Sequence, residues 1–279
     1  MNPEAPNPAA ASPDAAALTA ASPGALRGKV ALVTGGSRGI GAAVCRALAA
    51  AGAAVAVNYR SSEGPAKEVV RAIEEAGGTA LAVPGDVADH AAAEEMVRRT
   101  TAELGGLHIL VNNAGVAKDA LIYTMAPDDW LDVMRVNFGG VFNCTKAALP
   151  HFMSQGEGVI VNVSSVMGER GWVGESNYAA SKGAVNAFTR CCAMEAARFG
   201  VRVNAVLPGF SPTDLVAGLT EGQTGKGIRR QIPMRRFGSV EQIAEVVRFL
   251  AGPESAYMTG SLVTVDGGAM TALGLGRPN

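Results

Sequence analysis

Short apolar runs alternate with helical stretches along most of the chain, and this alternation limits its fold more than any other feature. Seven runs have the length and composition of strands, at residues 30–34, 54–59, 80–84, 109–112, 158–163, 202–206 and 262–265. Several are apolar at nearly every position, which is typical of parallel strands covered on both faces. Helical stretches lie between them, near residues 40–51, 64–76, 89–104, 127–153, 177–199 and 239–250. The pattern predicts right-handed βαβ units in an α/β, doubly wound Rossmann fold with a seven-stranded parallel sheet.

The alternating pattern begins after an Ala/Pro-rich segment, and we expect a single domain over residues 28–279. Residues 1–27 contain 10 Ala and 5 Pro, show no amphipathic period and predict a disordered tail. They have neither the basic and apolar blocks of a secretory signal nor the Arg content of a transit peptide, which predicts a cytoplasmic protein. The least regular stretch, residues 208–238, is a candidate mobile lid.

Charge and composition exclude several kinds of partner. The 24 Lys and Arg are balanced by 25 Asp and Glu, which argues against nucleic-acid binding because phosphate recognition needs an excess of clustered cations. No segment approaches the ~20 uninterrupted apolar residues that span a bilayer, so no membrane association is expected. The cysteines form no CxxC pair and the histidines are scattered, and we therefore expect no metal site.

A glycine-rich turn, TGGSRGIG at residues 34–41, joins the first predicted strand to an Ala-rich helix. A strand, turn and helix in this order place the pyrophosphate of a dinucleotide against a helix N-terminus. Gly35 permits the turn, while Gly39 and Gly41 let the backbone approach phosphate and sheet, although the spacing matches the common GxGxxG pattern only loosely. The same residues fit a hydrolase GxSxG elbow, but the last histidine, His151, lies inside a predicted helix, which disfavours that alternative.

The end of the second predicted strand bears on the choice between NAD and NADP. An acidic residue there would bond the ribose hydroxyls of NAD and repel a 2′-phosphate. The chain has Asn58, Tyr59 and Arg60 at this point and no acid. Arg60 and Arg38 of the glycine turn can both point at one phosphate, which arginine binds through charge-assisted hydrogen bonds. These residues predict NADPH/NADP+ as the cofactor, the alternative being two arginines that only contact solvent.

Tyr178 and Lys182 stand four residues apart in a predicted helix and therefore project from the same face. An ammonium close to a phenol stabilises the phenolate, so we expect Lys182 to lower the pKa of Tyr178 from its ordinary value near 10. Hydride transfer to a ketone creates an alkoxide, which needs a proton donor. Tyr178 is the predicted donor.

Five motifs in order make residues 28–272 similar to the short-chain dehydrogenase/reductase family. They are the glycine turn, the NNAG sequence at 112–115, the Tyr178/Lys182 pair, the PG sequence at 208–209 and the VDGG sequence at 265–268. The resemblance implies an NAD(P)-dependent oxidoreductase. It places at the cofactor Gly35, Ser37, Ile40, Gly41, Asp86, Val87, Asn113, Gly115, Pro208, Gly209 and Thr213, together with Tyr178 and Lys182. For Asp86, the start of the following helix offers a capping role as the alternative.

The resemblance also assigns the other catalytic groups. Ser165, thirteen residues before Tyr178, would hydrogen-bond the substrate carbonyl, and its neighbour Ser164 is the rival that the family spacing disfavours. Asn137 lies in the middle of the predicted helix 127–153, a poor place for Asn by propensity. In the family this residue marks a kink or holds a water that relays protons towards Lys182, which itself also bonds the nicotinamide ribose.

Within the family, the sequence resembles 3-oxoacyl-[acyl-carrier-protein] reductases and acetoacetyl-CoA reductases. This resemblance implies a thioester-tethered ketone as substrate and an acyl carrier protein as a potential partner. The chain departs from these reductases in three places. SQGEG at 154–158 replaces a basic run before the fifth strand, which removes an attractive surface for an acidic carrier protein. The loop after Ser165 carries Glu169 and Glu175, and the predicted lid carries Ser211-Pro212 in place of a commoner Ile-Glu-like pair, both where the substrate would enter. An unusual acyl group, for instance a polyketide intermediate, and a free sugar, quinone or other small ketone both remain open. Family members are usually tetramers, so a homotetramer is expected.

Overall fold

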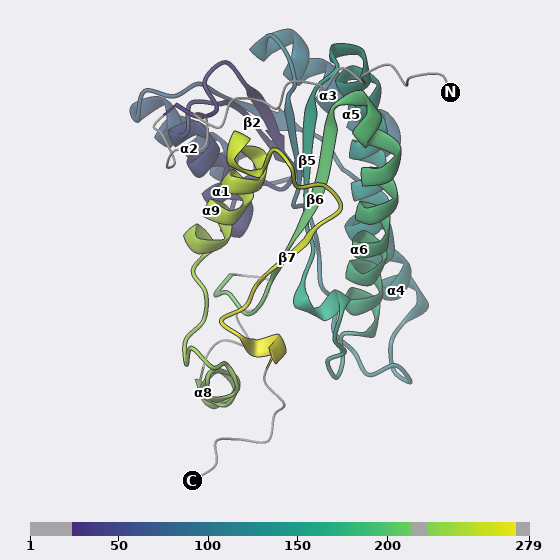
Figure 1. Ribbon diagram of the computed structural model, residues 1–279. Coiled ribbons are helices and arrows are strands. Elements are labelled where there is room, and N and C mark those ends of the chain that lie inside the picture. Colours follow the sequence, from purple (N-terminus) through teal and green to yellow (C-terminus); the bar gives the residue numbers. More distant parts are fainter. Residues whose placement is uncertain (1–23, 214–221, 272–279) are drawn as a thin grey trace, which may run out of the picture.

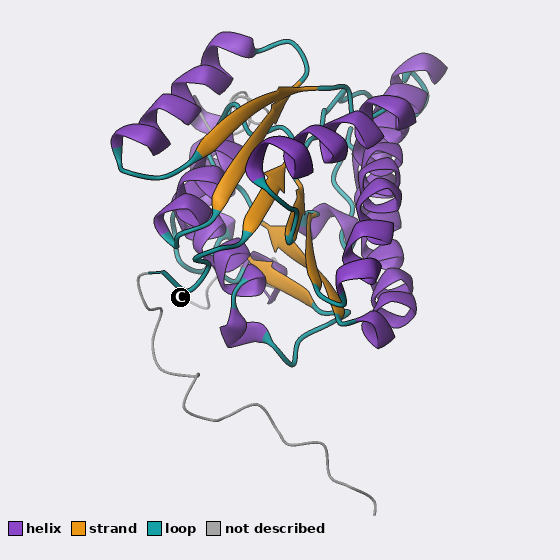
Figure 2. Ribbon diagram, turned by 90° about the horizontal axis from the view of Figure 1, so that it is seen from above, coloured by secondary structure: helices purple, strands orange, loops and turns teal. Residues whose placement is uncertain are grey.

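Seven parallel strands form one sheet in the order β3-β2-β1-β4-β5-β6-β7. Helices surround this sheet (Figure 2). The computed structural model describes residues 24–213 and 222–271. The strands are β1 Val30–Val33, β2 Ala54–Tyr59, β3 Ala80–Pro84, β4 Ile109–Asn112, β5 Gly158–Val163, β6 Val201–Pro208 and β7 Leu262–Val265. All neighbouring pairs are parallel. This confirms the predicted seven-stranded, doubly wound Rossmann sheet.

Helices cover both faces of the sheet, which is why the strands are apolar on both sides (Figure 1). One layer contains α1 Gly39–Ala50, α2 Glu63–Glu75 and α9 Val240–Ala251, with α1 packed on α9. The other contains α3 His90–Leu104, α5 Gly140–Gln155 and α6 Ser176–Ala196, with α3 packed on α5. Helix α4, Pro127–Met134, precedes α5, and α8, Gly222–Gln231, lies apart from both layers (Figure 1). No described helix is long and apolar enough to cross a membrane.

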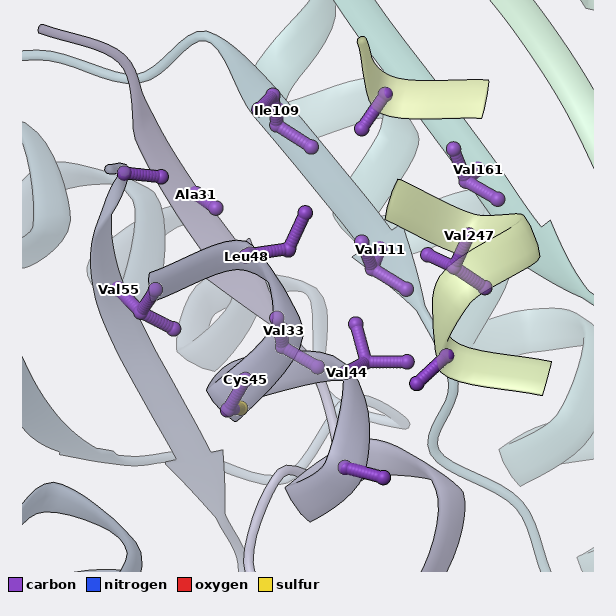
Figure 3. Packing of buried hydrophobic residues seen from close by; sticks show 14 of the residues in the cluster. Ala31, Val33, Val44, Cys45, Leu48, Val55, Ile109, Val111, Val161 and Val247 are labelled. Carbon is purple, nitrogen blue, oxygen red and sulfur yellow. The ribbon is translucent and has the colours of Figure 1, made fainter. Parts of the chain in front are cut away.

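The sheet separates two apolar cores. On the α1/α9 side, Val33, Val44, Leu48, Val111 and Val247 are fully buried in one cluster (Figure 3). The opposite cluster contains larger side chains from α3, α5 and the strands, among them Met96, Leu110 and Phe152. Burial of this apolar surface supplies the main driving force for folding and fixes the strand ends that carry the site.

Three boundaries differ from the sequence-based expectation. The predicted helix 127–153 is interrupted by a π-helical turn at Arg135–Gly139 between α4 and α5. Strand β6 continues to Pro208, two residues beyond the predicted end. The predicted tail ends too late, because Leu26 is buried in the α1/α9 core and its N–H donates to the Ala51 carbonyl at 2.9 Å. Residues 1–23 lie outside the described part of the chain.

The region predicted as a lid contains a helix, α8, that the composition of this region does not predict. Helix α8 holds three glycines in ten residues, and glycine has a low helix propensity. Ile228 and the following Ile232 are nevertheless 5% and 2% exposed and anchor this segment to the body. Residues 214–221 of the predicted lid lie outside the described residues.

Candidate active site

A cavity of about 500 Å³ lies at the carboxyl ends of the strands, where β1 and β4 are neighbours and the chain connections run to opposite sides. This is the topological switch point, where open α/β sheets bind their ligands. All the predicted cofactor residues line the cavity, and so do three of the four predicted catalytic residues. The exception is Asn137. The structure therefore brings the sequence motifs together in one place.

The glycine turn adopts a backbone that larger residues would not allow. Gly35 has a φ of +61°, a conformation that L side chains rarely adopt. A Cβ on Gly41 would lie 2.2 Å from the Gly35 carbonyl oxygen. Helix α1 then begins with no side-chain cap at its N-terminus, so its first N–H groups are left for a ligand. These features fit the pyrophosphate of a dinucleotide.

Side chains from neighbouring strands hold the glycine turn in place. The Asn113 Nδ2 donates to the carbonyl oxygens of Thr34 and Gly35 at 2.9 and 3.1 Å. The Thr34 Oγ1 accepts from the N–H groups of Asn113 and Ala114 at 2.9 and 3.1 Å. The Gly35 N–H donates to the Asn58 Oδ1 at 3.1 Å. The sequence did not predict that Thr34 and Asn58 position the turn. Thr34 belongs to the glycine-rich motif itself, and Asn58 belongs to the end of the second predicted strand, which was used to predict the cofactor.

One end of the cavity, which the sequence predicts to hold the adenine, contains the residues predicted to choose between NAD and NADP. Arg38 and Arg60 are both exposed and both line the cavity. The Asp86 Oδ1 accepts from the Ala88 N–H at 2.9 Å and thereby shapes the turn after β3. The alternative role of Asp86 as a helix cap is wrong, because Asp89 caps α3 by accepting from the Ala92 N–H.

The catalytic groups meet at the other end of the cavity. Ser165 follows β5, and its Oγ accepts from the Met167 N–H at 3.1 Å. Tyr178 and Lys182 project from the first turns of α6, and the Lys182 Nζ lies 5.5 Å from the centroid of the Tyr178 ring. The same Nζ donates to the Val163 carbonyl oxygen at 2.9 Å.

Burial, rather than the neighbouring ammonium, dominates the proton affinity of these groups. Desolvation raises the pKa of Tyr178 to about 12, and a hydrogen bond with Ser165 acts in the opposite direction. Desolvation also lowers the pKa of Lys182 to about 8. In the protein without cofactor, burial therefore outweighs the lowering of the Tyr178 pKa expected from Lys182, whose ammonium bonds the Val163 carbonyl.

Asn137 occupies the π-helical turn and does not line the cavity. It is fully buried, and its Oδ1 accepts from the Val116 N–H at 2.8 Å. Its Nδ2 donates to the Val116 carbonyl at 2.9 Å and to the Ser181 Oγ at 3.2 Å. The predicted kink is thus present as one extra residue in the helix, a feature that is frequent at functional sites. The side chain fixes the cavity wall beside Gly115 and ties it to α6.

A buried polar ladder connects the strands of the site to two helices. The Asn112 Nδ2 donates to the Asn162 Oδ1 at 2.9 Å and to the Thr145 Oγ1 at 3.1 Å. The Asn162 Nδ2 donates to the Thr189 Oγ1 at 2.9 Å. This ladder fixes β4 and β5 against α5 and α6, so that Ser165 and Lys182 keep their relative position.

Two carboxyl groups line the catalytic end of the cavity. Glu175 is only 7% exposed, and no described group donates a hydrogen bond to its carboxylate. Burial, together with the charge of Asp119, raises the pKa of Glu175 to about 7. Burial also raises the pKa of Asp119. The sequence identified Glu175 as a departure from the related reductases. It did not predict Asp119 as a site residue, and the only sequence signal for Asp119 is its position in the loop after the NNAG motif.

Comparison with known proteins identifies the family to which this chain belongs. A family model described as Enoyl-(Acyl carrier protein) reductase matches residues 35–270. A 3-oxoacyl-[acyl-carrier-protein] reductase of Synechocystis is 44% identical over 245 residues, which cover 88% of this chain and 98% of that protein. The chain belongs to the short-chain dehydrogenase/reductase family. An acetoacetyl-CoA reductase of Rhizobium meliloti is 41% identical over 240 residues, covering 86% and 98% of the two chains.

Solved structures of other short-chain dehydrogenases/reductases share the fold. A gluconate 5-dehydrogenase of Burkholderia cenocepacia in complex with NADP and tartrate has a TM-score of 0.85 and 36% identity, covering 89% of this chain and 97% of that one. A short-chain dehydrogenase of the same organism in complex with NADP has a TM-score of 0.83 and 38% identity, covering 88% and 99%. The present short-chain dehydrogenase/reductase is an oxidoreductase that acts on CH–OH groups with a nicotinamide cofactor.

Proposed function

We propose that this enzyme reduces the ketone of a 3-oxoacyl thioester to the 3-hydroxyacyl thioester with NADPH. The observation that carries the proposal is the single cavity with a glycine turn and two arginines at one end and Ser165, Tyr178 and Lys182 at the other. The reductases that are 41–44% identical over nearly their whole length support the thioester as substrate.

The residues at the catalytic end supply a proton and a site for the carbonyl. The nicotinamide, when bound, supplies the hydride. The hydroxyl of Ser165 donates a hydrogen bond to the substrate carbonyl oxygen and stabilises the charge that develops there. Tyr178, with a pKa of about 12, is protonated at neutral pH and gives its proton to the more basic alkoxide. Lys182, anchored on the Val163 carbonyl, stabilises the phenolate that remains.

The cofactor preference follows from charge at the adenine end. Arg38 and Arg60 line the cavity there, and the end of β2 carries no acid that would repel a 2′-phosphate. Asp86 and Val87 would lie beside the adenine. The two neighbouring structures that contain NADP support this assignment.

The wall next to Tyr178 is apolar and suits an acyl chain. Val166, Met167 and Phe210 line the cavity, and Trp172 packs edge-on against Phe210 with ring centroids 5.5 Å apart. Such a wall removes apolar substrate surface from water.

A second candidate, reduction of a free polyhydroxylated ketone, is favoured by one specific observation. The carboxyl of Glu175, to which no described residue donates a hydrogen bond, and that of Asp119 line the cavity and could accept hydrogen bonds from substrate hydroxyls. The gluconate 5-dehydrogenase among the structural neighbours points in the same direction.

Oxidation of NADPH and of NADH with a panel of thioesters and free ketones tests both candidates. We expect activity with acetoacetyl-CoA and NADPH. Tyr178→Phe should lower kcat by about 10²–10⁴-fold, because it removes the proton donor. Activity with sugar ketones and none with thioesters would select the second candidate. A strong preference for NADH would contradict the role given to Arg38 and Arg60.

We also propose a homotetramer assembled through α4, α5 and α6. Large apolar side chains are exposed on these helices, with Leu131, Phe142 and Met194 at 60%, 45% and 75% exposure. Exposed apolar groups on adjacent helices are typical of a subunit interface. Sedimentation velocity would show a tetramer, and Met194→Glu should lower the assembly state.

A further inference from the structure

Four basic side chains surround a hollow of about 230 Å³ on the segment that follows β6. Lys226, Arg229 and Arg230 come from α8, and Arg235 comes from the loop after it. Within residues 24–213 and 222–271, no carboxylate forms an ion pair with any of them. Four like charges around one hollow repel each other, and a bound anion relieves that repulsion.

The backbone holds one of these cations in an unusual conformation. Arg235 has a φ of +57°, and no other non-glycine residue in the described chain has a positive φ. Its guanidinium donates to the carbonyl oxygen of Arg230, so it is held beside the other basic residues. Backbone conformations of this kind are strained for a side chain other than glycine and concentrate at functional positions.

Two successive ring contacts connect the hollow to the catalytic cavity. The guanidinium of Arg229 lies 5.2 Å from the centroid of the Phe237 ring. The Phe237 ring lies 6.4 Å from that of Phe210, which lines the catalytic cavity. The Gly238 N–H also donates to the Phe210 carbonyl at 3.1 Å. The basic hollow is therefore connected through Phe237 to the apolar wall of the cavity.

We propose that the basic hollow binds the phosphate of a 4′-phosphopantetheine thioester, the group that acyl-CoA and acyl carrier proteins share. This inference rests on the proposed thioester reductase function. With the ketone at Tyr178, the pantetheine arm leaves along Phe210 and its phosphate meets the arginines. Arginine binds phosphate with bidentate, charge-assisted hydrogen bonds.

The surface before β5 does not offer an equivalent site. Residues 154–158 contain no cation, and Glu157 there pairs with Lys29 at 2.8 Å. An acidic or phosphorylated partner gains no attraction from this surface. The basic side chains of residues 226–235 instead provide the cations for the substrate arm.

The double variant Lys226→Gln/Arg230→Gln tests the inference, because both side chains are exposed and their loss should not affect folding. The substrates are acetoacetyl-CoA and the N-acetylcysteamine thioester of acetoacetate, which has no phosphate. We expect KM for the CoA ester to rise about tenfold or more, as the loss of charge-assisted bonds implies. KM for NADPH and kcat/KM for the N-acetylcysteamine ester should stay unchanged. The matched control is Lys67→Gln/Arg71→Gln on the exposed face of α2.

The outcomes separate this inference from the proposed function. If neither thioester is reduced by the wild-type enzyme, the proposed function fails. If both thioesters are reduced and the variant affects them equally, the phosphate site is overturned. A loss seen with acetoacetyl-carrier protein but not with acetoacetyl-CoA would also overturn it, since the basic residues would then contact the carrier itself. Independently of turnover, calorimetry should show that the wild-type protein binds 4′-phosphopantetheine more tightly than pantetheine, and equal affinities would refute the site.

Discussion

Replacing Glu175 by glutamine should stabilise the cofactor-free protein at pH 8 much more than at pH 5. The carboxyl group is buried in the cavity wall, has no hydrogen-bond donor among the described residues and lies near the charge of Asp119. Its ionisation is therefore unfavourable in the folded protein and unhindered in the unfolded chain. Glutamine has nearly the same shape and never ionises, so it avoids this cost.

The sign and size of this change in stability follow from the pKa of Glu175. Its folded pKa of about 7 lies above the ordinary value of 4.5, so its contribution to stability is fully present below pH 4.5 and is lost as pH rises through 7. One pKa unit corresponds to about 1.4 kcal/mol, which gives an upper limit of about 3 kcal/mol for the full loss. Because the group faces a solvent-filled cavity, we expect about 1–3 kcal/mol of added stability in Glu175→Gln at pH 8.

Urea unfolding of the wild type and the variant at pH 5, 6, 7 and 8 measures this difference. The matched control is Glu169→Gln, an exposed glutamate on the same loop. The stability difference for Glu175→Gln should grow between pH 5 and pH 7 and then level off, whereas the control should show no trend. A constant difference, or one that shrinks as pH rises, would refute the reasoning.

Three further predictions concern the cofactor turn and the π-helical turn. Replacing both Arg38 and Arg60 by alanine should lower the NADPH over NADH ratio of kcat/KM by at least tenfold, because phosphate contacts of this kind are worth about 1.5–3 kcal/mol each; an unchanged ratio would contradict their role. Gly41→Ala should weaken NADPH binding and lower the free energy of unfolding in urea by about 1–3 kcal/mol, since its Cβ would lie 2.2 Å from a carbonyl oxygen. A variant as stable as the wild type would show that the turn can move to accommodate the methyl group. Asn137→Asp removes two donated hydrogen bonds and sets a carboxylate against the Val116 carbonyl, so the melting temperature and kcat should both fall; an unaffected kcat would show that Asn137 acts only on stability.

The fold and the position of the site could be predicted because both depend on local patterns. Each strand is a short apolar run, and each run ends in a turn whose residues fall at the same edge of a parallel sheet. The glycine turn, the NNAG motif and the Tyr178/Lys182 pair reach one cavity for this reason. Sequence order alone is enough to predict that convergence.

Other features depend on contacts that no local pattern reveals. The π-helical turn at Arg135–Gly139 is fixed by bonds from Asn137 to Val116, twenty-one residues earlier in the chain. The pKa of Tyr178 is set by the burial of its hydroxyl, which i, i+4 spacing does not report. Helix α8 is held by two isoleucines among glycines and charges. In each case tertiary contacts override the local signal.

The π-helical turn also limits how this protein could be made more stable. Each residue turns an α-helix by about 100°, so deleting one residue from Arg135–Gly139 would restore a regular helix and rotate one side of the junction against the other. The shorter helix would have better hydrogen-bond geometry, but the Asn137 amide would no longer reach the Val116 backbone. If kcat falls in Asn137→Asp as predicted, the additional residue is a local stability cost that serves the active site, and selection for a regular helix would act against activity.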